Sequence, residues 1–124
     1  MIKVVFAWKD HPDIPAEECE RHYRAVHMPL ARRAFQGVAG FKLLRYNRVR
    51  RATVNDHNRR EPRVVEPDVD AWVELYFESE ALMQQAFERP ELQAQFEDHE
   101  HFMAVDTPAN IRVYFVDEEV ILSS

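Results

Sequence analysis

The order of strand and helix signals along the chain predicts an α+β domain with the element order βαββαβ. Three observations support this prediction: four segments have the pattern of strands, two stretches have helical spacing, and 124 residues normally form a single domain. In this ferredoxin-like arrangement both helices cover one face of an antiparallel sheet. The opposite face of the sheet is then left open.

The first strand is expected over residues 2–8, which are rich in β-branched and aromatic side chains and end at a turn rich in Asp and Pro. Both alternate rows of this strand are apolar. We assign Val5 and Ala7 to the face beneath the helices. Phe6 and Trp8 are then expected on the open face.

A helix is expected from Pro15, which suits the first helical turn, to about His27. Apolar or semi-apolar residues recur at the spacing of a helix face that packs on a core: Cys19, Tyr23, Val26 and Leu30. Pro29 has no amide hydrogen, and its ring clashes with the carbonyl group four residues earlier. The helix is therefore expected to kink or stop near His27, with a kinked continuation to Phe35.

The second and third strands are expected over residues 40–50 and 69–78. One row of the third strand is purely apolar and is expected beneath the helices: Ala71, Val73, Leu75 and Phe77. Its other row is expected on the open face: Trp72, Glu74, Tyr76 and Glu78. In the second strand we assign Phe41 and Leu43 to the helices. The open face then receives Lys42, Leu44, Tyr46 and Arg48.

Ser79 is expected to cap a second helix, which Pro90 then restarts at a first helical position. One face of the restarted helix carries Leu92, Phe96, His99 and Met103. The last strand is expected over residues 111–116. Its inward row is Ile111, Val113 and Phe115, and its outward row is Arg112 and Tyr114.

These assignments leave a row of large side chains on the open face: Phe6, Trp8, Leu44, Tyr46, Trp72, Tyr76 and Tyr114. A large aromatic side chain buries roughly 150–250 Å². The apolar area of this face is therefore larger than the apolar area that a monomer usually exposes. We therefore expect a homodimer in which two sheets pack face to face and enclose a cavity lined by rings. A monomer with a partly wetted sheet is the alternative.

The segment 52–67 is polar and longer than most hairpin loops. It contains Arg59, Arg60 and Arg63. A solvated, charged hairpin is the simplest interpretation. The alternative is that its charge attracts an anionic ligand to the mouth of the cavity.

Composition excludes several classes of protein. With 2 glycines the chain has no glycine-rich phosphate loop, and its net charge of -6 argues against a nucleic-acid partner. Its 1 cysteine rules out an internal disulfide and a Cys-rich zinc site. The apolar start of the chain is too short for a signal peptide or a membrane span, so we expect a cytoplasmic protein without a membrane segment.

A resemblance to the EthD family rests on the run His22-Tyr23-Arg24-x-x-His27-x-Pro29-Leu30, on the strand before it and on the element order. Weaker support comes from Phe77-Glu78-Ser79 and from Asp98-His99 before Phe102. The resemblance covers nearly the whole chain and implies a dimeric α/β barrel. The wider superfamily includes muconolactone-type isomerases, polyketide cyclases, cofactor-free monooxygenases and haem-degrading enzymes, so the resemblance implies a fold rather than one reaction.

His27 and His99 are the candidate catalytic residues, because an imidazole with an ordinary pKa of about 6.5 suits general acid or base catalysis. The alternatives are that His27 caps carbonyl groups freed by Pro29 and that His99 is a core histidine. The candidate substrate-binding residues are Phe6, Trp8, Leu44, Tyr46, Trp72 and Tyr76. No metal and no cofactor are expected, because the histidine spacings match no standard zinc site.

These candidates favour a small, cofactor-independent catabolic enzyme that moves a proton on an aromatic or lactone-like hydrophobic compound. Isomerase, cyclase and lyase reactions all fit this description. One alternative is a cofactor-free monooxygenase or related oxidoreductase, in which the substrate itself activates oxygen. The other is a non-catalytic accessory protein that binds a hydrophobic small molecule without changing it.

Overall fold

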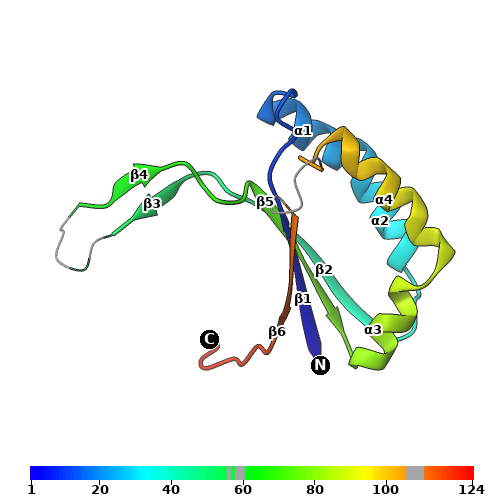
Figure 1. Ribbon diagram of the computed structural model, residues 1–124. Helices are drawn as coiled ribbons and strands as arrows, with labels where there is room; N and C mark the ends of the chain where they lie inside the picture. The colour runs from blue at the N-terminus through cyan, green and yellow to red at the C-terminus, as the bar shows by residue number, and fades with distance from the viewer. Residues whose placement is uncertain (56, 58–60, 106–110) are drawn as a thin grey trace.

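The computed structural model describes residues 1–55, 57, 61–105 and 111–124. Its main sheet has 4 strands, all antiparallel, in the spatial order β2-β5-β1-β6. The strands are β1 (Ile2–Trp8), β2 (Phe41–Arg48), β5 (Ala71–Phe77) and β6 (Ile111–Val116). All the helices lie on one face of this sheet (Figure 1). The predicted ferredoxin-like α+β fold is confirmed.

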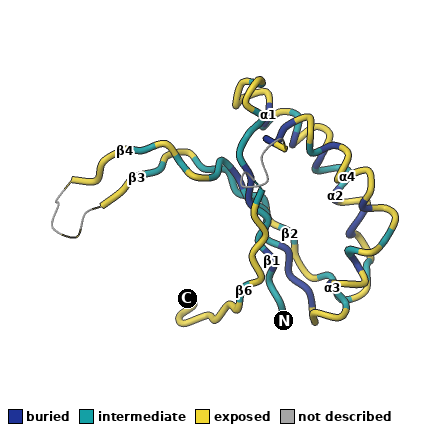
Figure 2. Tube along the Cα trace, in the orientation of Figure 1, coloured by how far each residue is buried: buried dark blue, intermediate teal, exposed yellow. Residues whose placement is uncertain are grey.

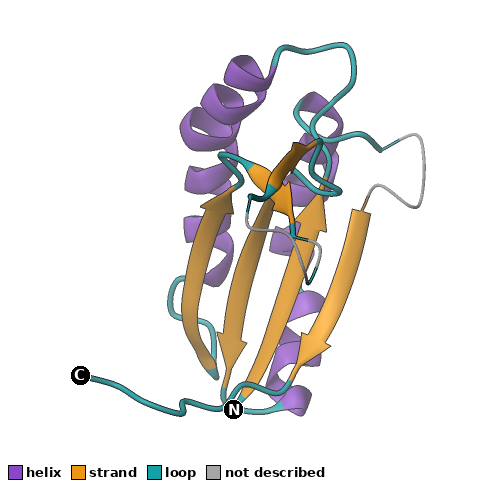
Figure 3. Ribbon diagram, turned by 90° about the vertical axis from the view of Figure 1, so that its left-hand side faces the viewer, coloured by secondary structure: helices purple, strands orange, loops and turns teal. Residues whose placement is uncertain are grey.

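The helical segments form two runs that lie behind the sheet in the view of Figure 3. The first run comprises α1 (Ala16–His22), the π-helical turn η1 (Tyr23–His27) and α2 (Met28–Phe35). The second run comprises α3 (Glu80–Phe87), η2 (Pro90–Leu92), α4 (Gln93–Asp98) and η3 (His99–His101). The Ser79 hydroxyl accepts a hydrogen bond from the backbone N–H of Leu82 at 3.2 Å, which confirms the predicted cap.

The first helical run does not stop at His27. Pro29 lies in the first turn of α2, and just before it the helix widens into the π turn η1. A π turn holds one more residue than an α turn, so it changes which side chains face the core. His27 is 5% exposed and Val26 is 42% exposed. The predicted buried face through Val26 was therefore wrong beyond Tyr23, and the face continues instead through His27 and Ala31.

Strand pairing decides which row of β1 faces the helices. Residues paired directly across neighbouring antiparallel strands point to the same face of the sheet. Phe6 pairs with Val73 and Trp8 with Ala71, and both partners pack against the helices as predicted. The assignment of Phe6 and Trp8 to the open face was therefore wrong. Because both rows of β1 are apolar, alternation in the sequence did not distinguish them.

A β-bulge reverses the alternation within β2. The register between β2 and β5 shifts between Phe41 and Leu43. One extra residue at this point moves every later side chain to the other face. Leu44 and Tyr46 pack in the core, whereas Leu43 is exposed. The assignments of Leu43 to the helices and of Leu44 and Tyr46 to the open face were therefore wrong.

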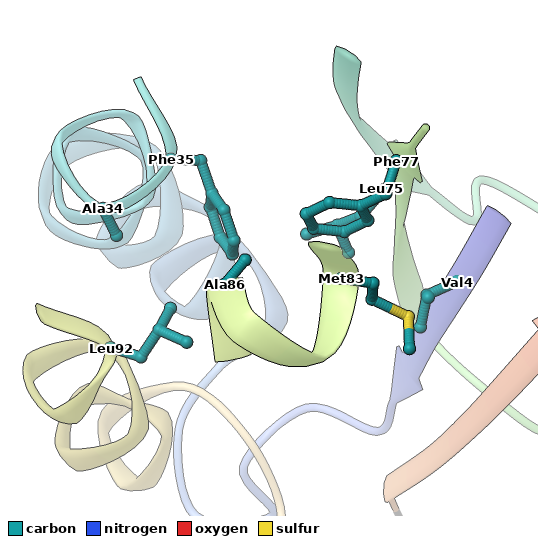
Figure 4. Packing of buried hydrophobic residues seen from close by; sticks show 8 residues of the cluster. All are labelled: Val4, Ala34, Phe35, Leu75, Phe77, Met83, Ala86 and Leu92. Carbon is teal, nitrogen blue, oxygen red and sulfur yellow. The ribbon is translucent and has the colours of Figure 1, made fainter. Parts of the chain in front are cut away.

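The core between sheet and helices has two clusters. Figure 4 shows the first cluster, which lies where α2, α3 and η2 meet β1 and β5: Val4, Ala34, Phe35, Leu75, Phe77, Met83, Ala86 and Leu92. The second cluster surrounds Trp8 and contains Cys19, Tyr23, Ala71, Phe102 and Met103. Gly40 has a φ of +80°, and a Cβ atom there would lie 2.6 Å from the Leu82 side chain. The entry into β2 therefore requires glycine.

Between β2 and β5 the chain forms an antiparallel hairpin of β3 (Ala52–Val54) and β4 (Arg63–Val65). The hairpin projects on the side of the sheet away from the helices (Figure 1), and much of it is exposed (Figure 2). Arg63 is exposed, and Arg59 and Arg60 lie outside the described residues. Within the described ranges, no helix combines the length and the apolar character that crossing a membrane requires.

Candidate functional site

A cavity of about 240 Å³ lies between the sheet and the helices of one chain. Its lining is almost entirely aliphatic and aromatic, with polar atoms contributed chiefly by Tyr23, His27, Gln95 and His99. Among the described residues that line it, none has a carboxylate, ammonium or guanidinium group. Because an unpaired charge is costly in such surroundings, the cavity suits an uncharged and largely apolar ligand.

The sequence predicted a chamber between two subunits, on the open face; that chamber stays a prediction, whereas this cavity lies within one chain. Phe6, Trp8 and Leu44 line the cavity from the sheet side and are covered by the helices of their own chain. Their inward orientation follows from the pairing of β1 and from the bulge in β2. The large aromatic row predicted for the open face is therefore divided between the two faces.

The other predicted ligand contacts lie outside this cavity. Tyr46 does not line the cavity but stacks on Tyr23, which does, with ring centroids 4.2 Å apart. Burial raises the pKa of the Tyr46 hydroxyl. Trp72 and Tyr76 lie on the open face, as their row in β5 predicted, and do not line the cavity.

The most developed polar feature of the cavity wall is a pair formed by His27 and Asp98. Nδ1 of His27, on η1, lies 3.1 Å from Oδ2 of Asp98, at the end of α4. When Nδ1–H donates to this carboxylate, Nε2 is the nitrogen that accepts a proton. Burial lowers the pKa of His27 although Asp98 opposes that shift. The imidazole is therefore neutral near pH 7 and has the protonation state of a general base.

Asp98 is bound on both sides. Its second oxygen, Oδ1, lies 2.7 Å from Nε2 of His22, whose side chain is 26% exposed. The carboxylate therefore links a surface histidine of α1 to the buried His27. Asp98 was missing from the predicted site residues. The available signal was its place in the sequence. Asp98 is three residues after Gln95, on the same face of a helix, and directly precedes His99.

His99, at the start of η3, lies beside His27 with ring centroids 5.3 Å apart. On its other side is Phe6, with ring centroids 5.4 Å apart. Burial and the neighbouring His27 lower the pKa of His99 to about 4. His99 lines the cavity together with Leu92 and Met103, as the predicted helix face required. Its catalytic role stays a prediction.

One side of the cavity is open to solvent at the edge of the sheet. Val113 and Phe115 on β6 and Phe96 on α4 line the cavity and are nevertheless exposed, Phe115 to 62%. β6 is an edge strand, so among the described residues no further strand lies beyond it. Ligand entry is therefore expected between β6 and α4.

The open face of the sheet has a different character. Glu74 accepts hydrogen bonds from Nε1 of Trp72 at 3.0 Å and from Nδ2 of Asn47 at 3.1 Å. The hydroxyl of Tyr76 donates to Glu118 at 2.8 Å. The ammonium group of Lys3 lies 3.3 Å from Glu74 and 2.7 Å from Glu118. We call this set the open-face network: Lys3, Asn47, Trp72, Glu74, Tyr76 and Glu118.

The sequence matches the EthD domain over residues 11–106, which is most of the chain. The chain belongs to the EthD family. The resemblance stated from the histidine-containing helix is therefore confirmed. No curated protein matches the sequence. In the described part of this EthD chain, no three His, Cys, Asp or Glu side chains are grouped so as to hold a metal ion.

Solved structures share the fold of this EthD protein at low sequence identity. An EthD family protein from Bacillus halodurans is 19% identical over 96% of this chain and 99% of its own, with a TM-score of 0.64. A dimeric protein of unknown function and ferredoxin-like fold from Bacteroides fragilis is 15% identical over 96% and 95% of the two chains, with a TM-score of 0.52. SnoaB, a cofactor-independent oxygenase from Streptomyces nogalater, is 11% identical over 99% and 97%, with a TM-score of 0.51.

Proposed function

We propose that this EthD protein is a cofactor-independent enzyme of small-molecule catabolism that moves a proton on an uncharged aromatic or lactone-like compound. The observation that carries the proposal is the state of His27. It is a buried imidazole at the wall of an apolar cavity, its pKa is lowered by burial, and its Nδ1 is held by Asp98. This combination supports a general base aimed at a bound ligand.

In the proposed reaction, Nε2 of His27 takes a proton from the carbon next to a carbonyl group of the ligand. The products of this step are an enolate and an imidazolium, and Asp98 stabilises the imidazolium. In a conjugated enolate, return of the proton to the far carbon gives an isomer. Attack of the enolate carbon on a second carbonyl group, whose oxygen then takes the proton from the imidazolium, gives a cyclised product. The uncharged wall favours these two outcomes over decarboxylation, whose substrate has a carboxylate.

The test is exchange of carbon-bound protons with solvent. 2-Tetralone, an uncharged two-ring ketone, is incubated with the protein in D₂O, and loss of its proton signal next to the carbonyl is followed by NMR. His27→Gln is expected to lower the protein-dependent exchange rate about 10²- to 10⁴-fold, the range that general base catalysis supplies. His57→Gln, the same change at an exposed position of the hairpin, is the matched control. A folded His27→Gln variant with the wild-type exchange rate would overturn the proposal.

A cofactor-free monooxygenase is the second candidate, because the fold is shared with SnoaB, which is described as a cofactor-independent oxygenase. Such an enzyme also begins by removing a proton from its substrate, and the resulting anion then reduces oxygen. Consumption of oxygen in step with loss of the ligand distinguishes this candidate from isomerisation or cyclisation, which use none.

The third candidate is a ligand-binding accessory protein. The apolar cavity supports binding as well as it supports catalysis. A ligand that binds tightly but shows no exchange, no oxygen uptake and no change after long incubation would favour this candidate over both enzymes.

We also propose that the protein is a homodimer. One structural neighbour is described as dimeric, and the edge strand β6 and the tail after it expose large apolar side chains. Those that do not line the cavity are Tyr114, Val120, Ile121 and Leu122. Association with a second copy would remove this area from water. Sedimentation as a single chain at micromolar concentration would contradict the proposal.

A further inference from the structure

Gln95 has a buried side-chain nitrogen without a hydrogen-bond partner in the described part of the chain. Its side chain lies on α4, and the residue is 8% exposed. Its Nε2 atom is buried and, within the described residues, has no partner. An unpaired amide in an apolar place destabilises the fold, and an aliphatic side chain of the same length would not. The position of this amide therefore requires an explanation beyond packing.

Gln95 lines the same cavity as the proposed base, His27. Gln95 and His99 are four residues apart in one helical run, so they occupy the same face on successive turns. Both line the cavity, and the ring of His99 lies 5.3 Å from that of His27. A small ring compound that touches His27 is therefore within reach of the Gln95 amide.

The described residues contain two buried polar atoms without a hydrogen bond, and the first is Nε2 of Gln95. The second buried polar atom without a hydrogen bond is the Tyr46 hydroxyl, and Tyr46 does not line the cavity. Asp98 uses one oxygen for His22 and the other for His27. Of the two buried unpaired atoms, only Nε2 of Gln95 belongs to a residue that lines the cavity.

We infer that Gln95 recognises the carbonyl oxygen of the ligand: its amide N–H donates to that oxygen while the rest of the ring compound contacts the apolar wall. The ligand class is then an uncharged cyclic ketone, lactone or quinone-like compound, and neither a hydrocarbon nor a carboxylate. Because this inference rests on the proposed function for the direction of reaction, the same donor stabilises the enolate oxygen after proton removal.

The test compares two ligands of one skeleton, 2-tetralone and the hydrocarbon tetralin, by calorimetric titration of the full-length protein. For each variant the ratio of the two dissociation constants measures the preference for the carbonyl group. Gln95→Leu is expected to lower this preference about tenfold, equivalent to about 1.4 kcal/mol. Gln93→Leu, the same change at an exposed position two residues earlier on α4, is expected to leave it unchanged.

A thermal melt accompanies the titration, and Gln95→Leu is expected to raise the melting temperature because it removes the unpaired amide. If Gln95→Leu does not fold, Gln95→Met is used with the same expectation. An unchanged preference in a folded variant overturns the inference, and it indicates that water alone satisfies the amide.

The outcome also separates this inference from the proposed function. Carbonyl preference that depends on Gln95, in a protein that exchanges no protons, supports the ligand class and contradicts the proposed proton transfer. Proton exchange that depends on His27, with a carbonyl preference independent of Gln95, supports the enzyme and overturns the role of Gln95.

Discussion

On the open face of the sheet the polar groups are paired with one another, whereas on the helix-covered face important polar groups are unpaired or held uncharged. Lys3, Glu74 and Glu118 form contacts of 3.3 Å or less in the open-face network. Beneath the helices, the Gln95 amide is buried without a partner, and His99 has a pKa lowered to about 4. Lys3 and Glu74 lie on strands, whereas Gln95 and His99 lie on the helical run that covers the other face, so the difference arises from the elements that carry these groups.

The comparison teaches where to look for function in this fold. Charges on the open face are neutralised by the chain itself and so stabilise the structure without requiring a ligand. Neutral imidazoles and an unpaired amide in an apolar cavity reduce stability, and such groups are typical of binding and catalytic sites. The following predictions, in order of expected effect, test whether the covered face serves function and the open face serves stability.

The largest effect is expected from Asp98→Asn. The change removes the charge that stabilises the His27 imidazolium and allows the opposite tautomer, so proton exchange on 2-tetralone should fall about 10²- to 10⁴-fold. The measurement is the NMR exchange rate in D₂O. Glu97→Gln, an exposed neighbour on α4, serves as the control. If Asp98→Asn exchanges protons at the wild-type rate, the polar groups of the cavity face have no special role in proton transfer.

The next effect concerns pH and His99. The pKa of His99 is about 4 in the folded protein and 6.5 as its ordinary value, so below pH 6.5 the unfolded chain binds more protons. Stability is therefore fully present above pH 6.5 and decreases as pH falls towards 4, by about 3 kcal/mol for this group. Urea unfolding at pH 7, 5.5 and 4 measures the decrease.

His99→Leu should show a smaller decrease over the same pH range, because the remaining decrease comes from other groups. Equal slopes for the two proteins would mean that His99 is not held neutral by the cavity.

A direct comparison of the faces uses neighbouring positions of β5. Leu75→Ala, on the cavity side, should cost about 2 kcal/mol, near the lower end for a buried leucine because Leu75 already borders a cavity. Glu74→Gln, on the open face, should cost less than about 1 kcal/mol, because an amide keeps the acceptor for Trp72 and Asn47. Denaturant unfolding measures the loss of stability in both variants. Equal losses would mean that the two faces do not differ in this respect.

The smallest effect is expected from Arg63→Glu on the hairpin. The cavity lies beneath the helices, and the hairpin projects from the other side of the sheet (Figure 1). Affinity for an uncharged ligand such as 2-tetralone should therefore change less than about twofold, since exposed charges are screened by salt. A larger loss would revive the interpretation that the hairpin recruits ligand.

The fold was predictable because β5 has one purely apolar row and because the six main elements follow one another in an unambiguous order. Three details were not predictable: the row of β1 that faces the helices, the bulge in β2 and the π turn before Pro29. The bulge and the π turn each shift by one residue which side chains face the core. Hydrophobic periodicity in the sequence does not reveal such a shift. In β1 both rows of side chains are apolar, so the alternation of polar and apolar residues does not indicate which row faces the helices.

The candidate site was predictable to the extent that a motif marked it. His27 belongs to the run that resembles the EthD family, and His99 lies in an apolar helix stripe. Gln95 carries no such mark, and Asp98 carries only the weaker one of the Asp98-His99 pair. The burial of these two side chains was not predicted, because a polar side chain on a short helix is usually solvated. Their burial depends on how the two helical runs meet, which is a property of tertiary structure.

The π turn at residues 23–27 has an evolutionary consequence. Such a turn corresponds to an α-helix that has gained one residue, and the segments on either side keep their original packing. Deletion of a single codon within it would leave a regular helix that still packs on the sheet but presents a different side chain to the interior. In this architecture a single codon therefore decides whether an imidazole or another side chain lies at the wall of the cavity.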